Sequence, residues 1–198
     1  MAGPFPAWFA VILVASAATG NLVARDWRWN LGLVAAQYLG AAVLAAAHWP
    51  VGMAAALLVT GWMSIAALGM TLSSLPVLHP QIERSWPQGL AFRLFMAGTI
   101  FVLAGGLAPR ADAFVPGIEA SVVAGTVLLV GIGFLELGTS DQILRIILGL
   151  LTVLTGFEVF YAAVEGSILV VGMLSTAILG LGLTGAHLLN LSQPEESE

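Results

Sequence analysis

Glu158 is the carboxylate that stands deepest inside a long apolar run of this sequence. The run, QILRIILGLLTVLTGFEVFYAAV, covers residues 142–164. Glu158 lies about six residues, or roughly 9 Å of helical rise, from its end. An ionisable group inside a membrane-spanning helix is costly, and it is a functional-site candidate for that reason. Glu158 is therefore a candidate proton relay or ion-binding carboxylate. The alternative is a carboxylate that reaches the membrane interface or pairs with a partner subunit.

Two further groups of polar side chains fall within or beside the apolar runs. The first is expected to form hydrogen bonds between helices and consists of Gln37, Tyr38 and Thr155. The second surrounds the short ELGTSD segment, is expected to be a solvated ion-pair cluster at the inner membrane interface, and consists of Glu136, Asp141 and Arg145. Arg93 is expected to extend its guanidinium to the same interface.

The sequence gives no sign of a metal, a cofactor or a catalytic centre. It has no cysteine, which excludes disulfides and thiolate metal sites. His48, His79 and His187 lie at the ends of apolar runs, and none has a second histidine at ligand spacing on the same helix. A phosphate-binding glycine loop after a strand, a nucleophile elbow and a paired-carboxylate signature are all missing. We therefore predict a non-catalytic chain with no cofactor.

The composition requires an apolar surrounding. Of the 198 residues 59% are hydrophobic and only 9% are charged, and the mean hydropathy is +0.99. Soluble domains have about 25% charged residues, so this chain has too few to cover a soluble surface, and lipid is its expected partner. The net charge of −5 includes three glutamates of the C-terminal tail, so nothing indicates a nucleic-acid partner.

The runs predict an all-α polytopic membrane protein with seven transmembrane helices. Their expected limits are Pro6–Val23, Asn30–His48, Val51–Ser73, Gln88–Leu107, Pro116–Leu135, Gln142–Val164 and Ser167–Leu189. Leu31–Met53 is loosely echoed by Leu148–Met173, each a helix, a tight turn and a second helix. This suggests an N-terminal three-helix unit (1–80), a linking fourth helix with its loops (81–115), a C-terminal three-helix unit (116–191) and a polar tail (192–198).

Arginine placement predicts the orientation. Five arginines fall on one side of the expected helices and one, Arg110, on the other; the five are Arg25, Arg28, Arg84, Arg93 and Arg145. Because basic residues favour the cytoplasmic side, the N-terminus is expected outside and the C-terminus in the cytoplasm. The expected location is the bacterial cytoplasmic (inner) membrane.

Two parts of the sequence resemble components of bioenergetic membrane complexes. From about Ser121 to Leu189, a helix with a short polar loop, ILRIILGLLTVLTGFEVFYA, a tight turn and ILVVGMLSTAILGLGLTGAHLL resemble the small three-helix subunit of respiratory complex I and its relatives in Mrp-type antiporters. The N-terminal half resembles the extension found in the membrane component E of hydrogenase-4 and of related formate hydrogenlyases. That extension has a Gln near the position of Gln37 in LVAAQYL.

The chain departs from this family where the family carries charge. Positions that match three membrane charges of the hydrogenase component hold uncharged residues, namely Leu154, Thr176 and Ser64 or Ile65. Glu158 lies about one helical turn from Leu154 and could take the place of the missing glutamate. If it does not, the resemblance implies the scaffold without the proton path. We expect a Glu158→Gln complex to assemble and its pumping to change little.

The resemblance implies a membrane-arm subunit of a redox-coupled proton- or cation-translocating assembly, structural in the main and with a reduced proton path. Larger antiporter-like membrane subunits are its implied partners. Two alternatives stay open at this point. One is a non-translocating structural subunit of another bioenergetic or photosynthetic complex. The other is a small stand-alone transporter, against which the scarcity of polar residues counts, because a substrate path needs a polar lining.

Overall fold

The computed structural model describes residues 4–75, 89–114 and 116–192, and all regular structure in these ranges is helical. Seven long helices are present: α1 Pro4–Val23, α2 Trp27–Ala45, α3 Val51–Ser74, α4 Leu90–Leu107, α6 Ala120–Thr139, α7 Ile143–Val164 and α8 Ile168–Leu191. A 3₁₀ turn, Ala108–Arg110, and the one-turn helix α5, Ala111–Phe114, follow α4. Arg84 and His79 lie outside the described residues.

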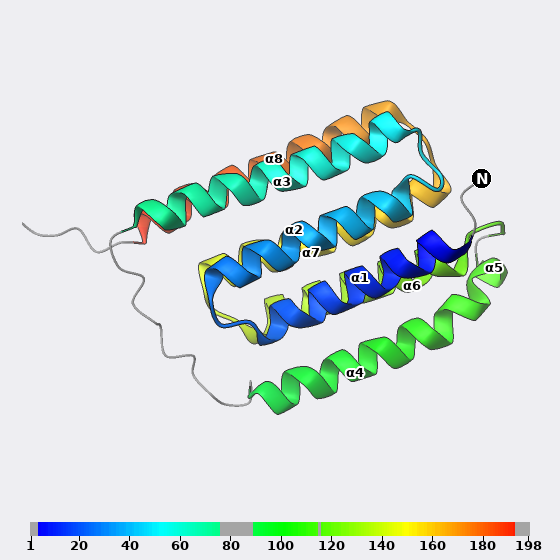
Figure 1. Cartoon of the computed structure of the whole chain (residues 1–198), viewed down its shortest axis with the longest axis horizontal. Helices are drawn as coiled ribbons and strands as arrows, with labels where there is room; N and C mark the ends of the chain where they lie inside the picture. The colour runs from blue at the N-terminus through cyan, green and yellow to red at the C-terminus, as the bar shows by residue number, and fades with distance from the viewer. Residues whose placement is uncertain (1–3, 76–88, 115, 193–198) are drawn as a thin grey trace, which may run out of the picture.

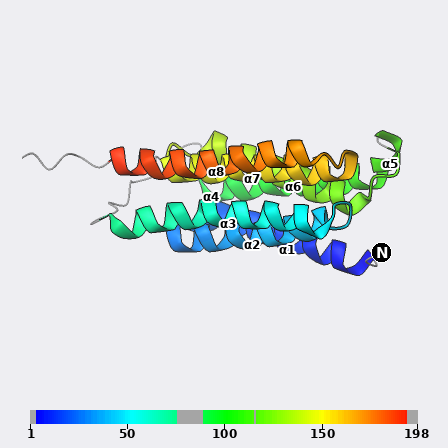
Figure 2. The same ribbon diagram turned by 90° about the horizontal axis from the view of Figure 1, so that it is seen from above.

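The long helices form two stacked layers, with α1, α2 and α3 in one and α6, α7 and α8 in the other (Figures 1 and 2). Each helix of the first layer packs on one of the second, in the pairs α1 with α6, α2 with α7 and α3 with α8. Helix α4 lies at the edge of the bundle against α6 and α1. The central pair, α2 and α7, is thereby flanked by the other helices, and the outward face of each remains exposed at residues such as Val43 and Phe157.

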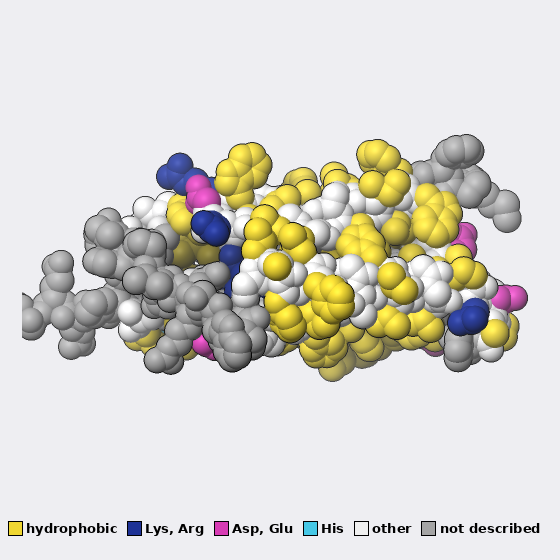
Figure 3. Space-filling view, turned by 90° about the horizontal axis from the view of Figure 1, so that it is seen from below, with side chains coloured by type: hydrophobic (Ala, Val, Ile, Leu, Met, Phe, Trp, Pro, Cys, Tyr) yellow, Lys and Arg dark blue, Asp and Glu magenta, His cyan; other side chains and the backbone are white. Residues whose placement is uncertain are grey.

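The surface of the bundle suits lipid. Five helical stretches are long and apolar enough to cross a membrane: Val51–Ser74, Leu90–Ala113, Ala120–Thr139, Ile143–Val164 and Ile168–Leu191. A shorter apolar stretch, Ala7–Val23, belongs to α1. On the face in Figure 3, charged side chains lie toward the two ends of the bundle and hydrophobic ones between them. The chain is an all-helical, multi-pass membrane protein.

Successive long helices alternate in direction, so the described arginines fall at two ends of the bundle. One end, here named the arginine end, holds Arg25, Arg28, Arg93 and Arg145, where α1 and α6 finish and α2, α4 and α7 begin. The other, named the opposite end, holds Arg110 between α4 and α6. The two-sided distribution that the sequence predicts thus recurs among the described arginines.

The fifth long helix is displaced from its predicted position. The apolar run predicted residues 116–135, whereas α6 covers Ala120–Thr139. Pro116 and Gly117 form a turn instead, in which Gly117 has φ +84°, a conformation that residues with a side chain rarely adopt. At its far end the helix continues through ELGT, in which Glu136 and Thr139 are buried, so counting apolar residues ended it too early. Glu136 consequently lies inside the helix.

Small residues allow α1 to approach α2, and α6 to approach α7, in the same manner. A Cβ added to Gly40 would lie 2.7 Å from Val14 Cγ2, and one added to Gly156 would lie 2.8 Å from Val130 Cγ2. Adding 116 to the residue numbers of the first contact gives the second, Gly156 with Val130. The same separation, 116 residues, lies between Trp49 and Glu165, which are joined by a hydrogen bond. Such close backbone approach is the usual way helices associate in lipid. The α1–α2 and α6–α7 contacts therefore share one packing pattern.

Candidate functional site

Glu158 lies in the enclosed centre of the bundle. Its side chain is 0% exposed, and neither carboxylate oxygen has a hydrogen-bond partner among the described residues. It does not reach the surface, as the interface alternative would require. An ionised carboxylate with no partner is very costly away from water, so this environment favours the protonated, neutral carboxyl unless water or a cation from outside the chain reaches it.

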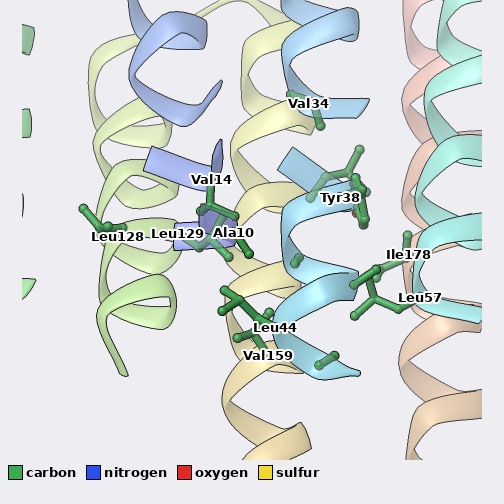
Figure 4. Packing of buried hydrophobic residues seen from close by; sticks show 14 of the residues in the cluster. Ala10, Val14, Val34, Tyr38, Leu44, Leu57, Leu128, Leu129, Val159 and Ile178 are labelled. Atoms are coloured by element: carbon green, nitrogen blue, oxygen red, sulfur yellow. The ribbon is translucent and has the colours of Figure 1, made fainter. Parts of the chain in front are cut away.

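Tyr38 and Thr155 lie on the arginine side of Glu158. Both are fully buried, Tyr38 lies within electrostatic range of Glu158, and the Tyr38 hydroxyl makes no hydrogen bond among the described residues. The Tyr38 ring rests on the bare backbone of Gly61 in α3, where any side chain would collide with it. Figure 4 shows Tyr38 on α2 with Leu57 and Ile178 beside it. Tight packing thus fixes the tyrosine next to α7.

One turn further toward the arginine end, a side-chain hydrogen bond joins the two layers. Gln37 Nε2 donates to Thr152 Oγ1 at 3.1 Å, and both side chains are fully buried. Thr152 Oγ1 donates in turn to the carbonyl of Leu148 at 2.8 Å. Gln37 Oε1 has no partner among the described residues. The contact crosses between α2 and α7, the two central helices.

The arginine end of the site is formed by Glu136. Asn21 Nδ2 donates to Glu136 Oε1 at 2.7 Å, and both residues are buried. A Cβ added to Gly149 of α7 would lie 3.2 Å from Glu136 Cβ, so the missing side chain makes room for the glutamate. Glu136 also lies within electrostatic range of Arg145 and Arg93. Helices α1, α4, α6 and α7 all contribute to this cluster.

The predicted solvated ion-pair cluster is wrong for two of its three members. Glu136 and Arg145 are only 3% and 7% exposed, whereas Asp141 is exposed. Arg145 donates to the carbonyl of Ala24 at 2.7 Å. Arg93, expected to reach the interface, is 4% exposed and donates to the carbonyl of Thr139 at 3.1 Å. Both guanidiniums thus satisfy carbonyls near helix ends.

These contacts form a ladder along α7. Each rung of the ladder is a position of α7 together with the polar side chain beside it. The four positions are 149, 152, 155 and 158, each three residues and about 4.5 Å of helical rise from the next. Glu136 lies beside the first position, Gln37 bonds to the second, Tyr38 adjoins the third, and Glu158 is the fourth. The ladder thus covers about 13.5 Å of helical rise, and because each three-residue step rotates the position by about 60°, its first and fourth positions lie on opposite faces of α7.

Sequence reasoning missed Asn21 and the inward position of Glu136. An amide in the apolar run AATGNLV was an available signal, because hydrogen-bonding side chains in spanning helices usually face other helices. His48 follows α2 in a turn and His187 is exposed on α8. No group of three or more potential metal-binding His, Cys, Asp or Glu occurs within 4–75, 89–114 and 116–192.

Compared with protein-family models, curated proteins and solved structures, the chain matches none.

Proposed function

We propose that this chain is a membrane-arm subunit of a redox-coupled, proton-translocating assembly of the complex I and hydrogenase-4 type, and that Glu158 is its proton-exchanging group. In the proposed arrangement seven helices cross the bacterial inner membrane, the opposite end faces outward and the arginine end faces the cytoplasm. The chain supplies scaffold and one short proton path beside larger antiporter-like subunits. It carries no redox chemistry of its own.

Glu158 carries the proposal. A fully buried carboxyl without a partner in the described residues is costly, and a purely structural helix would be more stable with an apolar residue there. The ladder supplies the hydroxyl and amide neighbours that a proton path needs. Glu136 adds a second buried carboxyl, which the sequence had placed outside the helix. The resemblance of residues 121–189 to the small complex I subunit supports the same interpretation.

A non-translocating structural subunit is the second candidate. It is favoured by the hydrogen bonds that tie the two layers together, such as Ser64 Oγ to the carbonyl of Ile178 at 3.0 Å and Trp49 Nε1 to that of Glu165 at 2.9 Å. Contacts of this kind suit a rigid spacer between larger subunits. The two candidates differ in whether proton transfer depends on Glu158.

Purification under mild detergent tests membership in a complex. A tagged chain extracted from its native membrane is expected to migrate with a much larger assembly that contains antiporter-like subunits and a redox module. Identification of the co-purifying subunits by mass spectrometry names that assembly. Recovery as a monodisperse monomer that transports ions in liposomes would overturn the proposal and favour a stand-alone transporter.

A further inference from the structure

The two central helices divide into a polar part and an apolar part at Glu158. Toward the arginine end, α2 and α7 carry Gln37, Tyr38, Thr152 and Thr155. Beyond Tyr38, α2 continues as LGAAVLA to its end, and beyond Glu158, α7 continues as VFYAAV. Tyr161 is the only residue in these two stretches with a polar side-chain atom. Apart from Tyr161, the polar side chains of these two helices near Glu158 therefore lie on its arginine side.

Several polar atoms on that side lack a partner. Gln37 Oε1, Asn21 Oδ1 and Glu136 Oε2 are buried and make no hydrogen bond within the described part of the chain. Buried polar atoms nearly always have a partner, and ordered water commonly supplies it. These three oxygens belong to the first two rungs of the ladder, on the arginine side of Glu158. They give water or a proton a set of acceptors along α7.

The other side of Glu158 is lined mainly by buried apolar side chains, although His48 Nδ1, in the turn after α2, is also buried without a hydrogen-bond partner in the described residues. Val159 and Ala162 of α7 and Leu44 of α2 are buried. Trp49, only 4% exposed, lies at the turn after α2 and donates from Nε1 to the carbonyl of Glu165 at 2.9 Å. Its ring also meets that of Tyr161 edge to face, with centroids 6.2 Å apart. The indole therefore joins the turn after α2 to the end of α7, directly beyond the apolar stretches.

From this asymmetry we propose that Glu158 is reached only from the arginine end, and that Trp49 is the residue that seals the opposite end. The proposal deepens the proton-exchange function proposed above, because it assigns that exchange to one side of the membrane. The test measures access to the ladder and needs no pumping assay. One-sided access can therefore be refuted while the proposed function stands, and the proposed function can be refuted while one-sided access stands.

Single-cysteine accessibility tests the claim in the assembled protein, because the chain has no cysteine of its own. Thr152→Cys probes the ladder and Ala162→Cys the sealed side. Ser192→Cys and Gly166→Cys, at exposed positions of the arginine end and the opposite end, report the sidedness of each vesicle preparation. Right-side-out and inverted vesicles are treated with silver nitrate in chloride-free buffer, and the thiols left free are counted with a maleimide tag after denaturation.

Thr152→Cys is expected to react only in the vesicles in which Ser192→Cys reacts, and Ala162→Cys in neither. Reaction of Thr152→Cys from the Gly166 side, or from no side, would overturn the access claim. Adding Trp49→Leu is expected to make Ala162→Cys reactive from the Gly166 side, whereas Trp49→Phe, which keeps a large ring, leaves it protected. If Ala162→Cys stays protected in the assembled Trp49→Leu protein, Trp49 is not the seal.

Discussion

The two three-helix units, α1–α3 and α6–α8, share a scaffold but differ in charge. Gly40 meets Val14 in the first unit as Gly156 meets Val130 in the second. Residues that bond across the layers are separated by nearly constant intervals: 115 for Asn21 and Glu136, 115 for Gln37 and Thr152, and 114 for Ser64 and Ile178. Corresponding positions of the two units therefore face one another.

The buried carboxyls lie in the second unit. If the two units are aligned so that Gly40 matches Gly156, Glu136 and Glu158 match Gly20 and Ala42 of the first unit. The large and the small residue of this contact also change places. In the first unit Gly20 faces the Leu33 side chain, whereas in the second unit Glu136 faces Gly149. The first unit contributes neutral groups to the ladder, Asn21, Gln37 and Tyr38. The comparison teaches that one scaffold serves as neutral support in one half and as the carrier of the ionisable groups in the other.

The shared scaffold can be broken at either glycine. Gly156→Ala and Gly40→Ala should each destabilise the protein by about 1–3 kcal/mol, because the added methyl group meets a packed neighbour. Gly172→Ala is the matched control: it has open space, so it should be neutral or slightly stabilising. Thermal unfolding in detergent, followed by fluorescence-detected gel filtration, measures the effect. Equal stability of all three variants would contradict the repeated packing.

Asn21 of the first unit should contribute the most to holding a buried carboxyl of the second unit, Glu136. Asn21→Leu removes the donor to Glu136 and should cost about 1–3 kcal/mol, the range for leaving a buried acceptor without its partner. Ser16→Ala is the control, since Ser16 bonds only within its own helix, to the Leu13 carbonyl. Unfolding measured in the same detergent compares them. An unchanged Asn21→Leu protein would show that Glu136 does not need the neutral unit.

A smaller effect is expected at the middle rung. Gln37→Leu breaks the bond to Thr152, and such bonds between membrane helices average about 0.6 kcal/mol and reach about 1.7 kcal/mol. Thr152→Val removes the same bond from the other unit. A double-mutant cycle on unfolding free energy should therefore give a coupling within that range. Additive single effects would mean that the two units are not coupled at this rung.

The helices were largely predictable, and the ladder only in part. Length and hydropathy located the long helices because spanning segments must be apolar, but the same rule ended α6 before Glu136 and began it before the turn at Gly117. Gln37, Tyr38 and Glu158 stood out as polar residues in apolar runs. That Asn21 would reach Glu136 depends on the stacking of the two units, a long-range arrangement that a single sequence does not reveal.

Proton translocation by vesicles with Glu158→Gln tests the central claim most directly. The glutamine keeps the shape of the side chain but cannot exchange a proton at neutral pH. The expectation from sequence, little change, assumed a carboxylate without polar neighbours; with Tyr38 and Thr155 beside it we now expect a loss. Glu165→Gln, at an exposed carboxylate beyond the end of α7, is the control.

The account predicts that Glu158→Gln assembles normally and keeps its electron transfer. Its proton translocation should fall by about tenfold or more, because a positioned proton-transfer group is worth at least that much. Glu158→Asp should retain part of the activity, and Glu165→Gln all of it. Full proton translocation by an assembled Glu158→Gln complex would contradict the account and leave the chain a structural subunit.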